Sequence, residues 1–222
     1  MTKNDTRSRG KGGGILNTVV NVAVLLFLGY ALLGSRGPLR MKIREYAAAR
    51  ETRMAAQDVF DRLASEGRVD PEQPTIIEFI DFQCPYCRDM HDVLSRGAAE
   101  GRFDVIVMHF PLDLIHPLAK RAAKASLCAE AQGFADDMNH LLLSTRNWMD
   151  DADWRRLASD AGIPDLKRFE ECLDESETEQ ELASHLAIAR DLGVRATPTF
   201  VSAGGVRSGV ATLEELVQLA KN

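Results

Sequence analysis

Cysteine is scarce in this sequence, because the 222 residues contain only four. Four cysteines are too few for a small scaffold held together by disulfides, and a chain of this length does not need one. Two of them, Cys84 and Cys87, form a C-x-x-C pair, and no second such pair exists. A structural zinc site usually takes two such pairs, so the single pair argues against zinc. Half of a zinc site, with His91 as a third ligand, stays open as the alternative.

Acidic residues are nearly absent from the start of the chain. Residues 1–44 contain eight Lys/Arg and one acid, whereas the remainder contains 19 Lys/Arg and 32 acids. An acidic body repels phosphate backbones, so the composition argues against nucleic acid as its partner. The hydrophobic fraction of 45% is ordinary for a globular protein, and the chain shows no internal repeat.

An apolar run leads directly into the C-x-x-C pair. Residues 76–82 are rich in β-branched and aromatic side chains, which predicts a strand buried on both faces. Pro85 suits the first position of a helix, so Cys84 lies where the strand passes into a helix N-terminus. Unpaired N–H groups and the helix dipole stabilise a thiolate there, and we expect the pKa of Cys84 to lie well below about 8.5. Cys87, one turn on, is within disulfide reach. We expect Cys84 to be the exposed attacking thiol and Cys87 the buried resolving one.

Formal charge is absent from residues 15–33. Nineteen uncharged, largely apolar residues at about 1.5 Å each just span a bilayer core of about 30 Å, which predicts a transmembrane anchor. A cleaved signal peptide, whose apolar core is about 7–15 residues, is the alternative. Four Lys/Arg on each side leave the positive-inside count tied. We place the N-terminus inside because C-x-x-C chemistry suits an oxidising compartment. Residues 1–14 then form a cytoplasmic tail, and the body lies on the periplasmic or extracellular side of the cytoplasmic membrane.

Residues 34–70 are predicted to be a helical stalk or linker. A helix over 39–66 contains no Gly or Pro, and its apolar stripe is thin for a coiled coil. This helix is a stalk that holds the body away from the membrane, a helix packed on the body, or an oligomerisation helix. The sequence leaves the three open.

The body, residues 71–222, has an α/β pattern. A helix over about 85–98 and a strand over 103–108 complete a β-α-β unit, which predicts parallel strands. The period is helical throughout a block of about residues 112–192. Strands then return at 197–208 around a Gly-Gly turn, and a capping box beginning at Thr212 opens a last helix.

This arrangement resembles the DsbA-like thiol–disulfide oxidoreductases, which are thioredoxin folds with a helical insertion. The resemblance covers about residues 70–222. A C-x-x-C pair alone is a weak signal, but a strand, the pair and a helix followed about 110 residues later by Gly-Val-x-x-Thr-Pro-Thr-Phe is a strong one. The markers are Glu78-Phe79, Cys84-Pro85-Tyr86-Cys87, Phe110-Pro111-Leu112 and residues 193–200.

The resemblance implies roles for residues outside the pair. The Thr197–Pro198 bond is expected to be cis and to face the cysteines, where it shapes the substrate groove together with Pro85 and Tyr86. An ordinary trans proline is the alternative. A cis bond is a specified feature, because it occurs in only about 5–6% of X–Pro bonds in folded proteins.

Glu78 is an acid within the apolar strand, and burial should raise its pKa. The resemblance implies that it lies beneath the buried cysteine and relays protons to and from Cys87. A position at the strand end, in contact with water, is the alternative. The resemblance also implies a structural disulfide between Cys128 and Cys172, with two separate buried thiols as the alternative. No metal or cofactor is implied, and the five histidines show no ligand spacing.

The function implied by the resemblance is disulfide formation in exported proteins. An unfolded or cysteine-containing client attacks the Cys84–Cys87 disulfide, and a quinone-linked membrane partner then reoxidises the enzyme. Tyr86 stands where many strong oxidants of the family have histidine, and this departure favours a second hypothesis. The chain would then be an isomerase or reductase supplied by a membrane electron donor. A third hypothesis is a non-catalytic, chaperone-like binder of unfolded exported chains, for which Cys84→Ser would leave activity intact.

Overall fold

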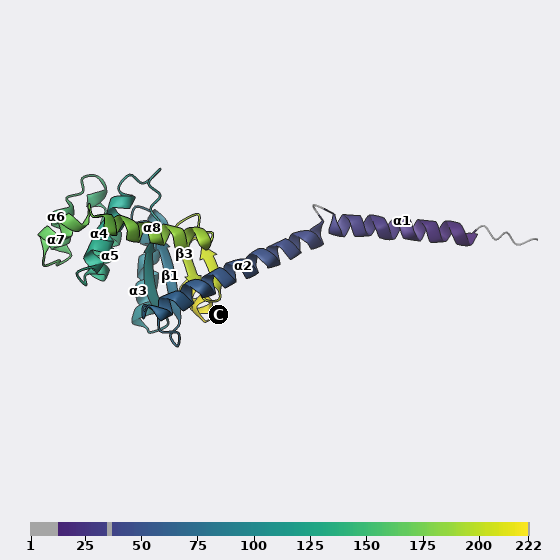
Figure 1. The fold of residues 1–222 in the computed structure, drawn as a ribbon, viewed down its shortest axis with the longest axis horizontal. Helices are drawn as coiled ribbons and strands as arrows, with labels where there is room; N and C mark the ends of the chain where they lie inside the picture. Colours follow the sequence, from purple (N-terminus) through teal and green to yellow (C-terminus); the bar gives the residue numbers. More distant parts are fainter. Residues whose placement is uncertain (1–12, 35–36, 222) are drawn as a thin grey trace, which may run out of the picture. The chain divides into compact units, whose positions relative to one another are not determined.

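The computed structural model describes residues 13–34 and 37–221, in two compact units, Met1–Arg50 and Glu51–Asn222. Helix α1 (Gly13–Leu33) belongs to the first unit (Figure 1). Within the described residues, no helix has both the length and the apolar character needed to cross a membrane. The anchor at 15–33 therefore stays a prediction. Most of the predicted tail, residues 1–12, lies outside the described residues.

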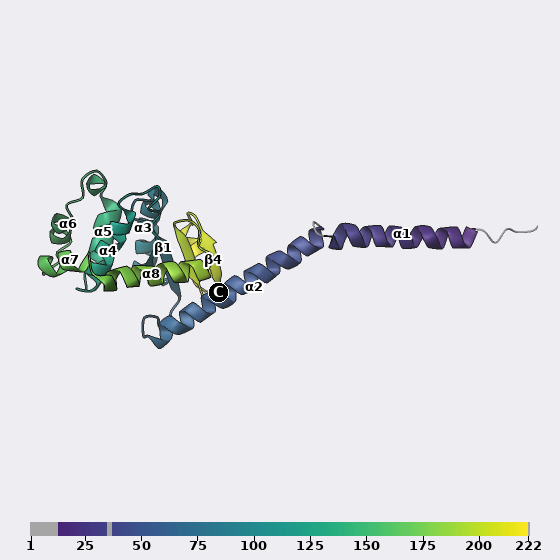
Figure 2. The same cartoon turned by 45° about the horizontal axis from the view of Figure 1, so that its top comes forward.

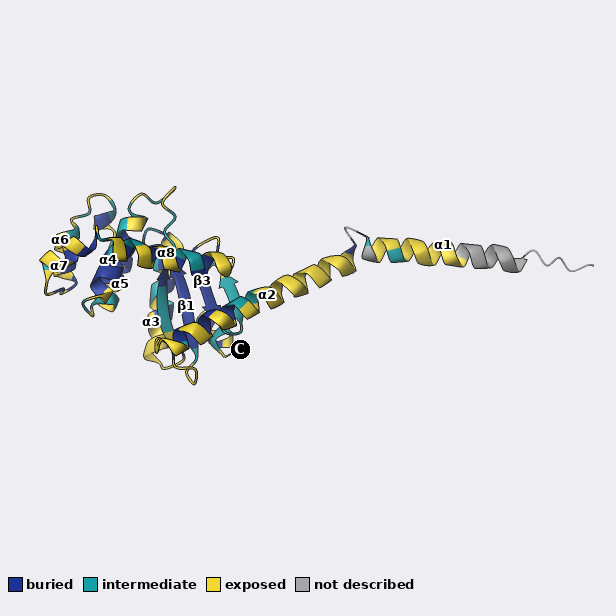
Figure 3. Ribbon diagram, in the orientation of Figure 1, coloured by how far each residue is buried: buried dark blue, intermediate teal, exposed yellow. Residues whose placement is uncertain are grey.

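A four-stranded sheet organises the second unit. Its order is β2-β1-β3-β4, with the bounds β1 Thr75–Ile80, β2 Asp104–His109, β3 Thr199–Ser202 and β4 Gly205–Ser208. Strands β1 and β2 are parallel, as the β-α-β pattern predicts, and the other two pairs are antiparallel. Strand β1 is therefore central, and all six of its residues are buried, as its apolar run predicts (Figure 3).

Helices cover both faces of this sheet, because alternate residues of each strand point to opposite sides. On one face, α3 (Pro85–Ala99) and α9 (Leu213–Ala220) pack against Ile76 and Phe200. On the other face, α2 (Pro38–Ser65) and α8 (Ser176–Asp191) pack against Ile77 and Phe79. The α2 residues in this core are Ala56, Val59, Phe60 and Leu63. Of the alternatives for this helix, packing on the domain holds for its C-terminal half.

A block of helices separates β2 from β3, in agreement with the predicted insertion (Figure 2). Its helices are α4 (Ala119–Glu130), α5 (Ala135–Ser144), α6 (Trp154–Asp160), α7 (Leu166–Cys172) and α8, with a 3-10 turn η1 at Asn147–Met149. The block has its own apolar core, which includes Trp148 and Phe169 and continues into Phe82, Cys84 and Cys87. The helical block is therefore part of the packing around the C-x-x-C pair.

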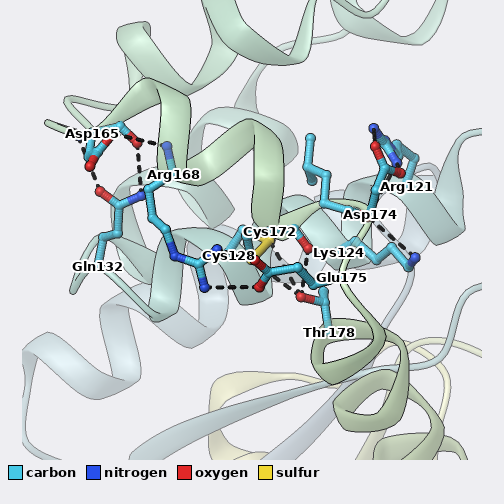
Figure 4. The surroundings of a disulfide bond; sticks show 11 residues. Arg121, Lys124, Cys128, Gln132, Asp165, Arg168, Cys172, Asp174, Glu175 and Thr178 are labelled. Carbon is cyan, nitrogen blue, oxygen red and sulfur yellow. Dashed lines mark hydrogen bonds and ion pairs between the residues drawn. A yellow bond between two sulfur atoms is a disulfide. The ribbon is translucent and has the colours of Figure 1, made fainter.

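A disulfide between Cys128 of α4 and Cys172 of α7 fixes the block internally, as the resemblance implies (Figure 4). The Cα atoms are 5.8 Å apart, a usual separation for this bond. The Thr178 hydroxyl donates to the Cys172 carbonyl oxygen at 2.7 Å and lies 3.3 Å from the Cys172 sulfur. Two solvent-exposed ion pairs, Arg168–Glu175 and Arg121–Asp174, lie near the disulfide.

Candidate active site

Cys84 lies at the junction that the sequence predicts. Its backbone follows the end of β1, and its N–H donates to the Asp81 carbonyl oxygen at 3.0 Å in a tight turn. Cys84 is the N-cap of α3 and Pro85 is the first helical residue. Cys84 and Cys87 are both free thiols, so the structure shows the reduced dithiol form.

The Thr197–Pro198 peptide bond is cis, as the resemblance implies. Antiparallel pairing of β3 with β1 places Thr199 opposite Phe79, so the segment just before β3 passes beside the end of β1. The Cys84 thiol donates to the Thr197 carbonyl oxygen at 3.4 Å. The structure thus brings the cis-proline segment and the C-x-x-C pair together across 113 residues of sequence.

The Cys84 side chain is less exposed than the sequence predicts. It is 4% exposed and Cys87 is 0% exposed, so both side chains are buried. The prediction of an exposed attacking thiol at Cys84 is therefore wrong. The reason is tertiary: the Thr197 backbone covers the sulfur from one side, and the apolar core of the helical block surrounds both cysteines. The two thiols therefore differ in their electrostatics much more than in their exposure.

The Cys84 thiolate is strongly stabilised. A hydrogen bond from the Cys87 thiol is the largest of the causes that lower the pKa of Cys84 from 9.0 to about 5. The Thr197 side chain lowers this pKa further, although its buried hydroxyl makes no hydrogen bond of ordinary geometry to any described residue. The Cys84 side chain makes no capping hydrogen bond of ordinary geometry. The backbone N–H groups of Tyr86 and Cys87 nevertheless lower its pKa slightly further. The lowered pKa suits Cys84 to be the nucleophile and the better leaving group of the pair.

Cys87 and Glu78 are both held in their neutral forms. Burial raises the pKa of Cys87 far above its usual value, and the hydrogen bond to Cys84 and the charge of Glu78 raise it further. Burial also raises the pKa of Glu78 from 4.5 to about 8, with a smaller contribution from the Cys84 thiolate. Glu78 is 3% exposed, so it does not occupy the water-exposed strand end that the sequence left open. At pH 7 the carboxyl group carries a proton beside a cysteine that resists losing one.

Asp81 is a site residue that the sequence analysis missed. Its buried carboxylate accepts the Gln83 N–H, the Leu112 N–H and a hydrogen bond from His116 Nδ1, each at 2.8 Å. Gln83 Oε1 in turn accepts the Leu118 N–H at 2.6 Å. These bonds fix the loop between β2 and α4 against the turn that carries Cys84. The available signal was a second acid at the end of an apolar strand, which must find partners if it is buried.

The structure gives no support to a zinc site. In the part of the chain that it describes, no group of three or more His, Cys, Asp or Glu side chains is arranged to hold a metal ion. His91 lies on α3, but its Nε2 atom is 2.9 Å from Nδ1 of His140 on α5. Its polar partner is therefore a second histidine.

Tyr86 is one of two exposed residues in the C-x-x-C turn, at 58% exposure. Leu114 and Ile115 are 98% and 69% exposed, on the loop that Asp81 fixes in place. Exposed aliphatic and aromatic side chains beside a reactive sulfur offer apolar contact to a flexible polypeptide. Of the residues predicted for the substrate groove, the structure exposes Pro85 and Tyr86 and buries Thr197 and Pro198.

Comparison with curated proteins finds matches to parts of much longer chains. The chain is 28% identical over 214 residues to the Na⁺/H⁺ antiporter NhaA 3 of Salinispora tropica, covering 91% of this chain and 31% of the relative. It is 31% identical over 134 residues to NhaA 1 of Mycolicibacterium gilvum, covering 58% and 22%. The chain thus spans less than a third of the length of these curated relatives.

Solved structures share the fold of the second unit. A linker-deletion variant of Proteus mirabilis ScsC has a TM-score of 0.62 at 19% identity and covers 96% of this chain and 97% of its own. The thiol–disulfide exchange protein α-DsbA2 of Wolbachia pipientis has a TM-score of 0.62 at 18% identity, with coverage of 76% and 96%. A thioredoxin-like oxidoreductase from Silicibacter pomeroyi has a TM-score of 0.58 at 24% identity, with coverage of 68% and 92%.

The model of the thioredoxin family matches residues 71–222, the region that contains the sheet, the C-x-x-C pair and the cis-proline. The chain therefore belongs to the thioredoxin family, with the fold of the DsbA and ScsC proteins.

Proposed function

We propose that this chain is a thiol–disulfide oxidoreductase that forms disulfides in exported proteins. One arrangement carries the proposal: Cys84 lies at the start of α3 beside the Thr197 backbone, with Cys87 buried one turn on. In this arrangement the pKa of Cys84 falls to about 5 and that of Cys87 rises far above its usual value. A disulfide between two such sulfurs is a strong acceptor of electrons, because its reduction produces a thiolate that the fold stabilises.

The first step is attack by a client thiolate on Cys84 Sγ of the Cys84–Cys87 disulfide. The bond from the client sulfur to Cys84 forms, and the bond to Cys87 breaks. Cys87 departs with the electron pair and needs a proton at once, because burial opposes its thiolate. Glu78, which is neutral at pH 7, supplies that proton.

The second step releases the oxidised client. A second client thiolate attacks the client sulfur of the mixed disulfide, and Cys84 leaves as a thiolate. Its low pKa makes it a good leaving group. The client has then lost two electrons and the enzyme has gained them. A quinone-linked membrane partner is the proposed acceptor that restores the Cys84–Cys87 disulfide.

Client binding is proposed beside the cis-proline. The Thr197 backbone faces Cys84, and an extended client can pair with main-chain groups of this segment while its sulfur meets Cys84. The exposed side chains of Tyr86, Leu114 and Ile115 add apolar contact that does not depend on client sequence. This suits unfolded or cysteine-containing exported proteins as substrates.

Membrane attachment belongs to the same proposal. Residues 15–33 carry no formal charge, and we propose that they form an anchor whose N-terminus lies on the cytoplasmic side. The domain would then act on the periplasmic or extracellular side, next to its redox partner. The curated relatives carry the names of membrane antiporters, which fits a domain that works near a membrane.

An isomerase or reductase is the second candidate, favoured by the exposed apolar side chains of α2. Leu39, Ile43 and Tyr46 are 46%, 56% and 77% exposed. They recur at helical spacing, which suits self-association, and an isomerase gains from oligomerisation. Redox titration of the C-x-x-C pair separates the candidates, since a potential near about −120 mV indicates an oxidase and one near about −270 mV a reductase.

Trapping tests the proposed chemistry directly. Cys87→Ala removes the resolving thiol, so cells expressing it should accumulate mixed disulfides between Cys84 and clients. Cys84→Ser is the matched control and should trap nothing. Recovery of exported proteins and of a membrane redox protein supports the proposal. A Cys84→Ser variant that keeps full activity would support the chaperone-like binder instead and overturn the proposal.

A further inference from the structure

A hollow of about 480 Å³ lies between α3, β2 and α5. Glu78 lines it, and so do His91 and His140. Its walls also include Leu94, Ala98, Asp104, Val107 and Asp136. The hollow is therefore bounded by the buried acid of the site and by the His91–His140 pair.

Glu78 needs a route to solvent that its own contacts do not provide. Its Oε1 atom is buried and has no hydrogen-bond partner among the residues that the structure describes. The strand neighbour Val107 and the helix residue Leu94, which line the same hollow, are apolar and transfer no protons. Water in the hollow is the medium that can exchange protons with this carboxyl group.

The two histidines connect the half-buried and exposed parts of the hollow. His91 is half-buried and His140 is exposed. Their nitrogens, His91 Nε2 and His140 Nδ1, are 2.9 Å apart, so one ring donates a proton and the other accepts it. Burial and the neighbouring His140 lower the pKa of His91, which favours its neutral, proton-accepting form. Imidazole is the side chain best suited to carry protons near neutral pH.

We infer that the His91–His140 pair exchanges protons between bulk solvent and Glu78 through water in this hollow. The inference rests on the proposed function, because Glu78 has to regain a proton only if Cys87 alternates between its disulfide and thiol forms. In the oxidase direction, Cys87 takes a proton from Glu78, and water in the hollow then returns a proton to the Glu78 carboxylate. The histidine pair replaces the proton that this water has lost with one from bulk solvent. Reoxidation runs the same transfers in reverse. The histidines act through Glu78 and do not touch the client.

Other charged side chains lie near the proposed proton path, and a test has to control for them. Asp104 of β2 and Asp136 of α5 line the hollow. Asp92 and Arg88 of α3 act on His91, Asp92 raising its pKa and Arg88 lowering it. Asp136→Asn is a matched control, because it changes a titratable wall residue of the hollow and leaves both imidazoles in place.

The test is a single-turnover reaction of the oxidised full-length protein with a reduced, cysteine-containing peptide, followed across pH in weak buffer. The double variant His91→Gln/His140→Gln should react roughly tenfold more slowly than the wild type, less than the full effect of direct acid–base catalysis. Added imidazole should restore the rate. The reduction potential and the pKa of Cys84 should stay unchanged, since a proton route alters rates and not equilibria. Asp136→Asn should react like the wild type.

A second variant keeps the test sound if the histidine substitutions disturb folding. Ala98→Phe places a ring at the exposed edge of the hollow and keeps both histidines, and it should slow the same step. Histidine variants with wild-type rates and no response to imidazole would overturn the inference. A wild type that does not exchange disulfides would instead overturn the proposed function, so the two failures are distinguishable.

Discussion

The pKa of Cys84 is the quantity on which the proposed oxidase depends, and one substitution tests its cause. The fold lowers this pKa from 9.0 to about 5, and the hydrogen bond from the Cys87 thiol is the largest cause. At pH 7 the thiolate fraction therefore rises from about 1% to about 99%. Removing the donor with Cys87→Ala should raise the pKa, whereas Cys87→Ser keeps a donor and should change it little.

The size of the expected change follows from the hydrogen bond. A bond to a charged acceptor contributes about 1.5–3 kcal/mol, or about one to two pKa units. Cys87→Ala should thus titrate near pH 6–7, roughly, and Cys87→Ser near pH 5. In the wild type, the lowered pKa stabilises the reduced form at pH 7 by about 3 kcal/mol, which makes the potential more oxidising by about 60 mV.

The assay is the ultraviolet absorbance of the thiolate against pH, with the alkylation rate as an independent measure. Cys84 is the only free thiol in both variants, because Cys128 and Cys172 are bonded to each other. Cys84→Ser provides the background. Equal titration midpoints for Cys87→Ala and Cys87→Ser would refute the reasoning, because the hydrogen bond could then not be the main cause.

Three further predictions concern other parts of the site and its support. Thr197→Val removes a hydroxyl that stabilises the Cys84 thiolate, so the titration midpoint should rise, by less than in Cys87→Ala. Glu78→Gln should stabilise the reduced protein by roughly 3 kcal/mol at pH 7 in urea unfolding. The pKa of Glu78 is raised, so its ionisation costs no stability below about pH 4.5 and increasingly more as the pH rises to about 8. A difference in unfolding free energy that does not depend on pH would contradict this account. Replacing Cys128 and Cys172 together by alanine opens a crosslink across 44 residues and should cost up to about 4 kcal/mol, while Cys84 still titrates near pH 5; unchanged stability would refute the structural role.

Much of the fold follows from local sequence patterns. The buried strand before the pair, the helix that begins at Pro85 and the capping box at Thr212 all lie where the sequence predicts them. Such features depend on residues a few positions apart, whose spacing matches the strand or helix period. The boundaries differ by one or two residues, as for β2, which begins at Asp104.

The cis bond at Pro198 and the pairing of Cys128 with Cys172 came from resemblance and not from local pattern. A disulfide requires two Cα atoms at a suitable separation, and residues 44 apart in sequence meet only if the helices between them pack in one way. The sequence alone left the two thiols open as separate residues. In the structure, α4 and α7 bring them together.

The sequence by itself identified the candidate reactive atoms: two sulfurs at a strand-to-helix junction, with an acid in the strand before them. Tertiary structure decided how these atoms behave. It buried Cys84 under Thr197, fixed the neighbouring loop to Asp81, and placed His91 and His140 at the hollow that reaches Glu78. The physical reason is that pKa values and burial depend on the distances between side chains in the folded protein. Local periodicity specifies strands and helices but leaves those distances undetermined.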